Sequence, residues 1–268
     1  MSPMKIVLTP NPYRDKQFRT VQQAKKILES CGVETVMCLP FDVDRDYELP
    51  KTMDFRDLHR EIKNADMLVC FGGDGTILHA SKIATAHGLP ILGVNIGTMG
   101  FIAELEAGEL ELLRKLPTGD YTLEPRSMID VTVTGANGQK LLHETALNDA
   151  VVTKGAIARV VQVSVYCDNV EATSFSGDGV IISTPTGSTA YSMSAGGPIV
   201  EPSARNLLIT PICAHAMLTK TIVVSPERVI SVRIGKIGRH NAYLSVDGGR
   251  AFRLNTGDVI TTKTAQKT

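Results

Sequence analysis

The sequence predicts two domains, a parallel α/β domain followed by an all-β domain. In the first hundred residues, short apolar runs alternate with helical patterns, which is typical of a parallel sheet with helices on both faces. Beyond residue 120, apolar and polar residues mostly alternate with period two and few long helical patterns remain, which indicates antiparallel strands. We therefore expect a Rossmann-like α/β domain at residues 1–103 and a β-sandwich-like domain at residues 104–268.

The first half is expected to alternate strands with helices. In chain order the patterns predict a strand at 5–9, a helix at 14–31, a strand at 33–39, a helix at 55–63, a strand at 67–71, a helix at 77–87 and a strand at 90–94. Gly32 and Gly88 follow two of these helices, at the position where glycine commonly ends a helix. The run 67–71 is apolar throughout, as expected for a strand that is buried on both faces.

The second half begins after a transitional helix near residues 109–116. Strands are expected where apolar and polar residues alternate, at 130–134, 161–165 and 230–234. The residues Gly-Ala-Asn-Gly at 135–138 are a hairpin signal, and a further helix is expected at 190–196.

Composition excludes several classes of protein. The 268 residues carry a formal net charge of +0, so no global field attracts nucleic acid or an anionic membrane. The longest apolar stretches are strand-length, and the N-terminal residues do not form a signal peptide. The five cysteines are scattered without metal-ligand spacing, as in a reduced cytosolic protein. We expect a cytoplasmic protein with no membrane or nucleic-acid partner and no metal site built from protein side chains.

A glycine-rich turn follows the buried strand at 67–71. Ligands of open α/β sheets bind beyond the carboxyl ends of the strands, and glycines let the backbone approach a ligand closely. The N-terminus of the next helix offers free N–H groups to phosphate oxygens. A carboxylate here would repel phosphate unless it were a general base or a metal contact; the alternative is a helix cap. The candidate ligand-binding residues are Gly72, Gly73, Asp74, Gly75 and Thr76.

Two familiar nucleotide-binding motifs are missing from the chain. The sequence contains no G-x-x-x-x-G-K-[ST], so it is not a P-loop protein. The first predicted strand leads into Thr-Pro-Asn-Pro at 9–12 instead of G-x-G-x-x-G, so the Rossmann mode of holding a dinucleotide is also absent.

A second dense segment, residues 176–198, is rich in Gly, Ser and Thr. Short side chains and exposed backbone at this density suit a ligand groove, in which Tyr191 could stack on a ring. The alternative is a long connecting loop that happens to be rich in Ser and Gly.

Taken together, these segments resemble the NAD kinase family along nearly the whole chain. The resemblance rests on five stretches: GGDGT at 72–76, NIGTMGF at 95–101, ALND at 146–149, the run 177–198 and TPICAH at 210–215. Diacylglycerol kinases, sphingosine kinases and phosphofructokinases have turns similar to the first stretch. The residues 184–198 are highly specific to the family.

The resemblance implies a phosphotransferase that moves a phosphoryl group from ATP, with Mg²⁺ or another divalent cation, to the 2′-hydroxyl of the adenosine ribose of NAD. It also implies an active site in the cleft between the two domains. A homodimer or homotetramer is implied as well, with a neighbouring subunit completing the site.

The family's functional residues map onto positions of this sequence. By that resemblance Asp74 is the catalytic base, and Asn148 and Asp149 hold the ribose and nicotinamide region of NAD. His79 and Arg159 stand where the family often has a basic residue near the ligand. The adenine and amide portions are contacted by Asp178 together with Thr189, Ala190, Tyr191, Ser192 and Ser194.

The chain departs from the family pattern at two positions, 149 and 249. Asp149 stands where Glu is more usual, which keeps the charge but shortens the reach, and Gly249 stands where many members have Gln.

Two alternative functions remain open at this point. A lipid kinase of the diacylglycerol type shares the glycine-rich turn, and a non-catalytic dinucleotide sensor could use the same scaffold. The sequence also leaves open whether polyphosphate replaces ATP and whether NADH is accepted.

Overall fold

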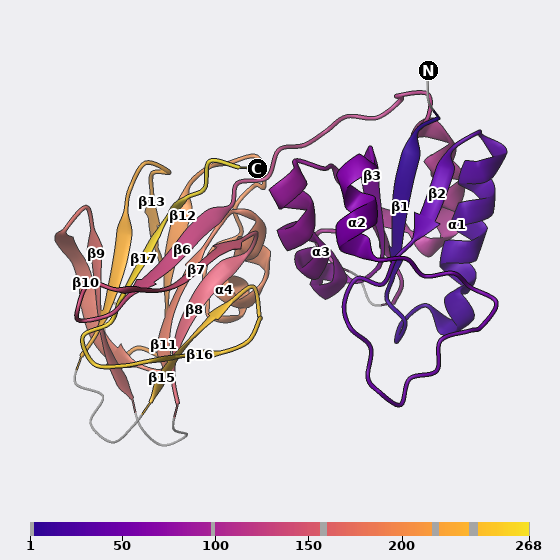
Figure 1. Ribbon diagram of the computed structural model, residues 1–268. Coiled ribbons are helices and arrows are strands. Elements are labelled where there is room, and N and C mark those ends of the chain that lie inside the picture. The colour runs from indigo at the N-terminus through magenta and orange to yellow at the C-terminus, as the bar shows by residue number, and fades with distance from the viewer. Residues whose placement is uncertain (1–2, 98–99, 156–159, 216–219, 236–240, 268) are drawn as a thin grey trace. The chain divides into compact units, whose positions relative to one another are not determined.

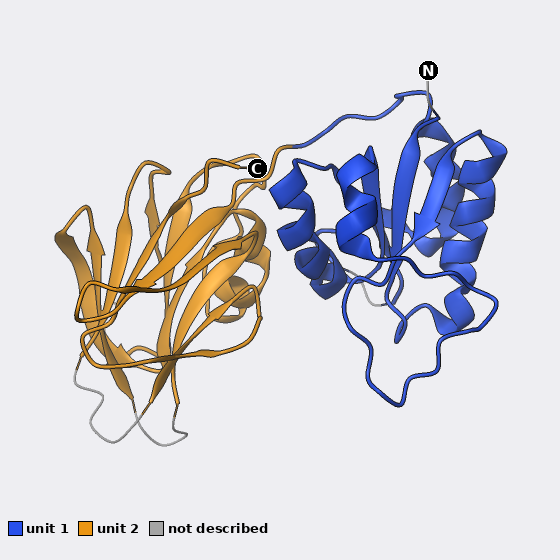
Figure 2. Cartoon of the chain, in the orientation of Figure 1, with its two compact units in different colours: residues 1–124 blue, residues 125–268 orange. Residues whose placement is uncertain are grey.

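The computed structural model describes residues 3–97, 100–155, 160–215, 220–235 and 241–267. The chain divides into two compact units, residues 1–124 and 125–268 (Figure 2). The predicted boundary at residue 103 is therefore corrected to the link between Glu124 and Pro125. The reason is that β5 (Leu105–Glu106) pairs with strand β4 (Ile91–Asn95) of the first unit. The 3-10 helix η3 (Ala107–Lys115) packs against helix α1 (Arg19–Ser30) of the same unit.

The first unit contains a five-stranded parallel sheet in the order β2-β1-β3-β4-β5. This confirms the predicted parallel α/β domain. Its remaining elements are β1 (Lys5–Pro10), η1 (Lys16–Phe18), α1 (Arg19–Ser30), β2 (Glu34–Met37), α2 (Leu58–Glu61), η2 (Ile62–Asn64), β3 (Met67–Gly72), α3 (Asp74–His87) and β4 (Ile91–Asn95).

Helices cover both faces of this sheet (Figure 1). Successive side chains of a strand point to opposite faces of its sheet. On one face, Val69 and Phe71 of β3 pack with residues of α1 and η3. On the other face, Leu68 and Cys70 pack with residues of α2 and α3. All six residues of β3 are buried. Burying a side chain such as Phe71 contributes about 1.5–3 kcal/mol, so the end of β3 is firmly anchored before the glycine-rich turn begins.

Helix α1 begins later than the predicted residue 14. The carboxylate of Asp15 accepts hydrogen bonds from the backbone N–H groups of Thr20 and Val21, at 3.0 and 2.9 Å. These bonds satisfy two of the free N–H groups in the first turn, so the helix starts at Arg19. Arg14 is thereby left in the loop after β1.

The second unit contains two six-stranded antiparallel sheets, in the orders β10-β9-β14-β17-β6-β7 and β13-β12-β11-β8-β15-β16. Residues of both sheets share one buried core, which confirms the predicted β-sandwich. The strands are β6 (Ile129–Thr134), β7 (Lys140–Ala146), β8 (Asp149–Lys154), β9 (Val161–Cys167), β10 (Val170–Gly177), β11 (Gly179–Ser183), β12 (Leu207–Ile212), β13 (Ile222–Val224), β14 (Ile230–Ile234), β15 (Ala242–Val246), β16 (Phe252–Leu254) and β17 (Val259–Thr264).

Two local predictions in this unit can be compared with the structure. The hairpin signal at 135–138 lies in the connection of β6 to β7, where the N–H of Gly135 donates to the carbonyl of Gln139 at 2.9 Å. The helix predicted at 190–196 is shorter, as α4 (Tyr191–Ser194), and it follows a 3-10 turn, η4 (Thr186–Thr189). Across the described residues, no helix combines the length and the apolar character that crossing a bilayer requires.

Candidate functional site

The glycine-rich turn joins the carboxyl end of β3 to the start of α3. Gly73 is the N-cap of the helix and has an extended backbone, with φ −121° and ψ −173°. Helix α3 begins at Asp74, earlier than the predicted residue 77. The sequence did not indicate this first turn because it is polar and shows no apolar periodicity. The free N–H groups of this first turn favour a negatively charged ligand such as phosphate.

Close packing fixes the shape of this turn. A Cβ atom on Gly72 would lie 2.3 Å from Oγ1 of Thr76, so no other residue fits at this position without displacing Thr76. The same Oγ1 accepts a hydrogen bond of 2.9 Å from Nδ2 of Asn11, in the loop after β1. The Thr76 side chain is buried and thus links two neighbouring strand ends.

The Asp74 side chain is held by the segment after β4. Its Oδ2 accepts a hydrogen bond from the N–H of Phe101 at 2.9 Å, and its Oδ1 accepts one from the N–H of Ile102 at 3.2 Å. A Cβ on Gly100 would come within 2.4 Å of Oδ1, so this approach requires glycine. Each carboxylate oxygen has a second lone pair. The carboxylate is therefore positioned by backbone groups and still able to accept a proton or a hydrogen bond.

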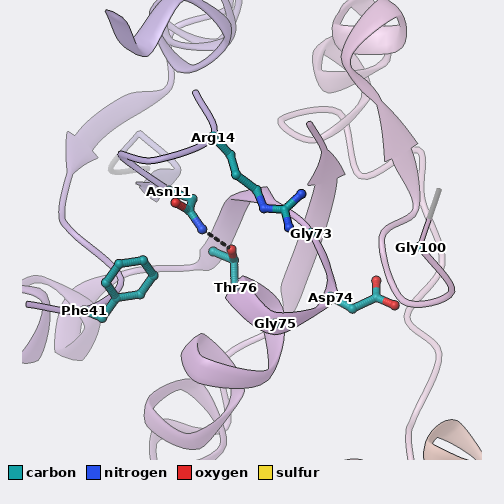
Figure 3. A pocket seen from close by; sticks show the side chains of 8 residues that line it. All are labelled: Asn11, Arg14, Phe41, Gly73, Asp74, Gly75, Thr76 and Gly100. Atoms are coloured by element: carbon teal, nitrogen blue, oxygen red, sulfur yellow. Dashed lines mark hydrogen bonds between the residues drawn. The ribbon is translucent and has the colours of Figure 1, made fainter. Parts of the chain in front are cut away.

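A cavity of about 410 Å³ opens beside the turn (Figure 3). Figure 3 shows Arg14 extending over the turn toward Gly73, whereas the Asp74 carboxylate points to the other side, toward Gly100. In the part of the chain that is described, Arg14 forms no ion pair with a carboxylate. The lining residues are Asn11, Arg14, Phe41, Gly73, Asp74, Gly75, Thr76 and Gly100.

Sequence reasoning did not name four of these lining residues as site residues: Asn11, Arg14, Phe41 and Gly100, of which only Gly100 lies in a stretch that carries the family resemblance. A signal existed for two of them. Asn11 and Arg14 directly follow β1, which is the neighbour of β3 in the sheet, and the carboxyl ends of adjacent parallel strands meet at one edge. Phe41 lies beyond β2 in an irregular segment, where no pattern indicates its position.

His79 lies one turn along α3 and is exposed. Its ring makes an edge contact with Phe41, with 5.6 Å between the ring centroids. Partial desolvation, and then the positive charge of Lys82, lower the pKa of His79 below 6.5. The imidazole stands next to one wall of the cavity, through its contact with Phe41.

In the second unit, Asn148 and Asp149 lie where β8 begins. The Asn148 side chain is buried, with 6% of its surface exposed, and its Oδ1 has no hydrogen-bond partner within the described part of the chain. Buried polar atoms are nearly always paired, so an orphaned amide oxygen marks a place where a ligand group could bind. The backbone carbonyl of Asn148 is fixed by the N–H of Thr184 at 2.9 Å.

Asp149 is 5% exposed and is unusually basic for a carboxylate. Burial first, and then the negative charge of Asp247, raise the pKa of Asp149 from 3.8 to about 7. Between these two pH values the folded chain holds a proton that the unfolded chain has lost. The contribution of Asp149 to stability is therefore complete below about pH 4 and is lost as the pH rises through about 7.

This pKa predicts that Asp149→Asn stabilises the protein at high pH. The amide removes a buried charge beside Asp247, so we expect the melting temperature to exceed that of the wild type by several degrees at pH 8. The gain should shrink steadily toward pH 4, where the wild-type carboxyl is neutral in both states. Thermal unfolding of both proteins from pH 4 to pH 8 measures this gain in melting temperature. A difference in melting temperature that does not change with pH would contradict the raised pKa of Asp149.

Most of the predicted residues at 189–194 gather at the same end of the sheet as Asn148, after β11 ends. Tyr191 is 43% exposed, as a residue that stacks on a ligand ring needs to be. Ser192 is buried, and its Oγ is 2.8 Å from Oγ1 of Thr210, so it ties α4 to β12. Thr189 and Ala190 are half-buried, and Ser194 is exposed.

The structure does not bring Asp178 to this end. In the antiparallel register of β11 on β8, Ser183 is opposite Asp149 whereas Gly179 is opposite Thr153. Asp178 therefore lies more than about 13 Å further along the strand, where it forms an ion pair of 2.5 Å with Lys154. The predicted ligand residue Arg159 lies outside the described residues.

Family models match both units. The model described as ATP-NAD kinase N-terminal domain matches residues 6–121, and the one described as ATP-NAD kinase C-terminal domain matches residues 147–268. The chain is 35% identical to the NAD kinase of Acetivibrio thermocellus over 263 residues, which cover 97% of this chain and 89% of that protein. It is 45% identical to the NAD kinase of Moorella thermoacetica over 201 residues, which cover 75% and 64% of the two chains.

Two solved structures share the fold of the whole chain. Yeast NADH kinase complexed with NADH superposes with a TM-score of 0.84 at 25% identity, over 99% of this chain and 81% of that one. An NAD kinase from Archaeoglobus fulgidus in complex with ATP superposes with a TM-score of 0.74 at 26% identity, over 98% and 91%.

Proposed function

Because this chain belongs to the NAD kinase family and is an enzyme of that family, we propose that it transfers the γ-phosphoryl group of ATP to the 2′-hydroxyl of the adenosine ribose of NAD, giving NADP and ADP. The solved relatives bound to NADH and to ATP support this choice of acceptor and donor. The relatives described above are NAD kinases and an NADH kinase, so they do not favour the lipid kinase or the sensor.

The proposed base is Asp74, and its position at the start of α3 is the observation on which the mechanism depends. Two backbone N–H groups hold its carboxylate beside a phosphate-binding turn. The ribose hydroxyl donates a hydrogen bond to this carboxylate and gives up its proton as the oxygen–phosphorus bond forms. General-base catalysis contributes about 10²–10⁴-fold, so the remaining acceleration comes from alignment and charge stabilisation.

The phosphates of ATP are proposed to bind the N–H groups of the turn at 72–76. Magnesium keeps several waters and is held largely by substrate phosphates, so a nucleotide-borne Mg²⁺ needs few ligands from the protein. The described residues contain no group of three or more His, Cys, Asp or Glu side chains arranged for metal binding. The cation supplies charge neutralisation on the phosphates when it is bound.

We expect Arg14 to bind the phosphates of ATP, because it is a cation at the wall of the cavity and no carboxylate among the described residues pairs with it. Arg14→Gln should raise the KM for ATP by roughly tenfold or more and leave the KM for NAD within a few fold, since a lost charge-assisted hydrogen bond costs about 1.5–3 kcal/mol. Steady-state kinetics with each substrate varied in turn measures this.

Arg19→Gln is the matched control, because Arg19 begins α1 and hydrogen bonds to the neighbouring Gln17 instead of lining the cavity. Equal effects of the two substitutions, or an unchanged KM for ATP in Arg14→Gln, would contradict this role.

The NAD molecule is proposed to contact Asn148 and Asp149 with its ribose and nicotinamide region. Tyr191 and its neighbours Thr189, Ala190, Ser192 and Ser194 are proposed to contact adenine and amide portions. Asp178 lies at the other end of β11 from Asn148 and Asp149. We therefore propose that Asp178 contacts an NAD molecule that is bound to a neighbouring subunit. This requires a homodimer or homotetramer, and a monomer in sedimentation at assay concentrations would contradict it.

The function is tested by offering possible acceptors separately. The chain is incubated with ATP and Mg²⁺ and with NAD, NADH or a diacylglycerol, while ADP and the phosphorylated product are quantified. We expect ADP and NADP to form in equal amounts with NAD. Phosphatidate formation would favour the lipid kinase, and NAD binding without ADP formation would favour the sensor.

A further inference from the structure

The tight turn between β15 and β16 places the carboxylate of Asp247 next to the segment that carries Asn148 and Asp149. Asp247 and Gly248 both have left-handed backbones, with φ 50° and 65°, and the N–H of Gly249 donates to the carbonyl of Val246 at 2.9 Å. Two consecutive left-handed residues form a hairpin turn that favours Asp-Gly or Asn-Gly. The turn is thus compatible with either Asp or Asn at position 247.

The Asp247 carboxylate accepts three backbone hydrogen bonds from one short segment. Its Oδ2 accepts from the N–H of Leu147 at 2.8 Å, and its Oδ1 accepts from the N–H groups of Asn148 at 2.8 Å and Asp149 at 3.1 Å. In return, the N–H of Asp247 donates to the carbonyl of Asp149 at 3.0 Å. A side chain about a hundred residues away therefore fixes the backbone at both proposed NAD-binding residues.

We propose that Asp247 is a positioning residue for NAD: its carboxylate holds the 147–149 backbone so that the side chains of Asn148 and Asp149 meet the dinucleotide. This inference rests on the proposed function, because it takes NAD as the ligand of these two side chains. The orphaned Oδ1 of Asn148 supports it, since this buried amide oxygen has no hydrogen-bond partner among the described residues and is left available to a ligand.

Asp247 also acts on Asp149 through its charge. Strands β11 and β15 flank β8 at this end. The uncharged Ser183 of β11 is opposite Asp149, and Asp247 lies in the turn directly after β15. Burial and the Asp247 charge together raise the pKa of Asp149 to about 7. Ribose hydroxyls donate best to an ionised carboxylate, so NAD affinity in the wild type should increase as the pH rises through about 7.

Two substitutions separate the geometry from the charge. Asp247→Asn keeps the shape and suits the turn but removes the charge and one acceptor, whereas Asp247→Glu keeps the charge and displaces the three acceptor bonds. We expect the dissociation constant for NAD to rise at least about tenfold in both variants. The pH at which affinity changes should fall in Asp247→Asn, because Asp149 loses its charged neighbour, and should stay near 7 in Asp247→Glu.

Calorimetric titration of NAD into the full chain from pH 5.5 to pH 9 measures both effects. Asp168→Asn is the matched control: Asp168 also has a left-handed backbone, with φ 49°, and its carboxylate accepts the N–H of Val229 at 2.9 Å at the β9–β10 turn. We expect NAD affinity in this control to stay within about twofold of the wild type.

Wild-type affinity in Asp247→Asn, or reduced affinity with an unmoved pH dependence, would overturn the inference. So would an equal loss in Asp168→Asn. If Asp247→Asn does not fold, Asp247→Glu decides alone, with wild-type affinity as the contradicting result. A wild-type chain that binds no NAD contradicts the proposed function instead, and this is seen before any variant is made.

Discussion

Replacing Asp74 by Asn should reduce the turnover of NAD phosphorylation by about 10²–10⁴-fold and leave the dissociation constant for NAD within a few fold of the wild type. The amide has nearly the same shape as the carboxylate, and its oxygen still accepts one of the two backbone hydrogen bonds that hold the Asp74 side chain. It cannot take up the proton of the ribose hydroxyl. Single-turnover kinetics, with NAD binding measured by calorimetry, separates the two effects.

A structural explanation of the same loss must also be tested. Asp66→Asn is a suitable control, because the Asp66 carboxylate lies in the same unit and accepts the N–H of Lys5 at 2.8 Å. We expect turnover in this control to remain close to that of the wild type. Turnover within tenfold of the wild type in Asp74→Asn would show that another group takes the proton.

The second large effect is expected for Gly187→Ala. A Cβ at position 187 would lie 2.1 Å from the backbone carbonyl oxygen of Asn148 and 2.5 Å from its carbonyl carbon. The obstacle is backbone that is already fixed by Thr184, so it cannot move aside as a flexible side chain would. We expect the free energy of unfolding to fall by about 1–3 kcal/mol or more and NAD affinity to fall with it.

Thermal unfolding and NAD titration of the Gly187→Ala variant measure these losses. Gly108→Ala is the control, since a Cβ at Gly108 has no neighbour within 4 Å. The control should change stability by no more than about 0.5 kcal/mol. A Gly187→Ala protein as stable as the wild type, with wild-type NAD affinity, would contradict the tight packing of this turn on Asn148.

Much of the first unit could be predicted because its strands and helices have strong periodic patterns. The continuous apolar run that ends in Gly72 indicated both a buried strand and the ligand-binding edge that follows it. The start of α3 was placed too late because its first turn, from Asp74, is polar. The domain boundary was placed too early because Leu110 and Leu113 look like a linker helix in the sequence, and only packing shows that they belong to the core of the first unit.

The candidate site was predicted where motifs are contiguous and missed where distant segments meet. Asp74 and Asn148 lie inside recognisable stretches. Arg14 comes from a different strand end, and Asp247 comes from a hairpin turn about a hundred residues from the segment that it holds. No periodicity reports such contacts, because they depend on strand order: β1 beside β3, and β15 beside β8.

The most direct test of the central claim is a crystal structure of this chain with NAD bound. We expect the 2′-hydroxyl of the adenosine ribose within hydrogen-bond distance, about 2.6–3.2 Å, of a carboxylate oxygen of Asp74. A 2′-hydroxyl that faces a different acid, with the adenosine remote from the glycine-rich turn, would contradict the role of Asp74 and the mechanism built on it.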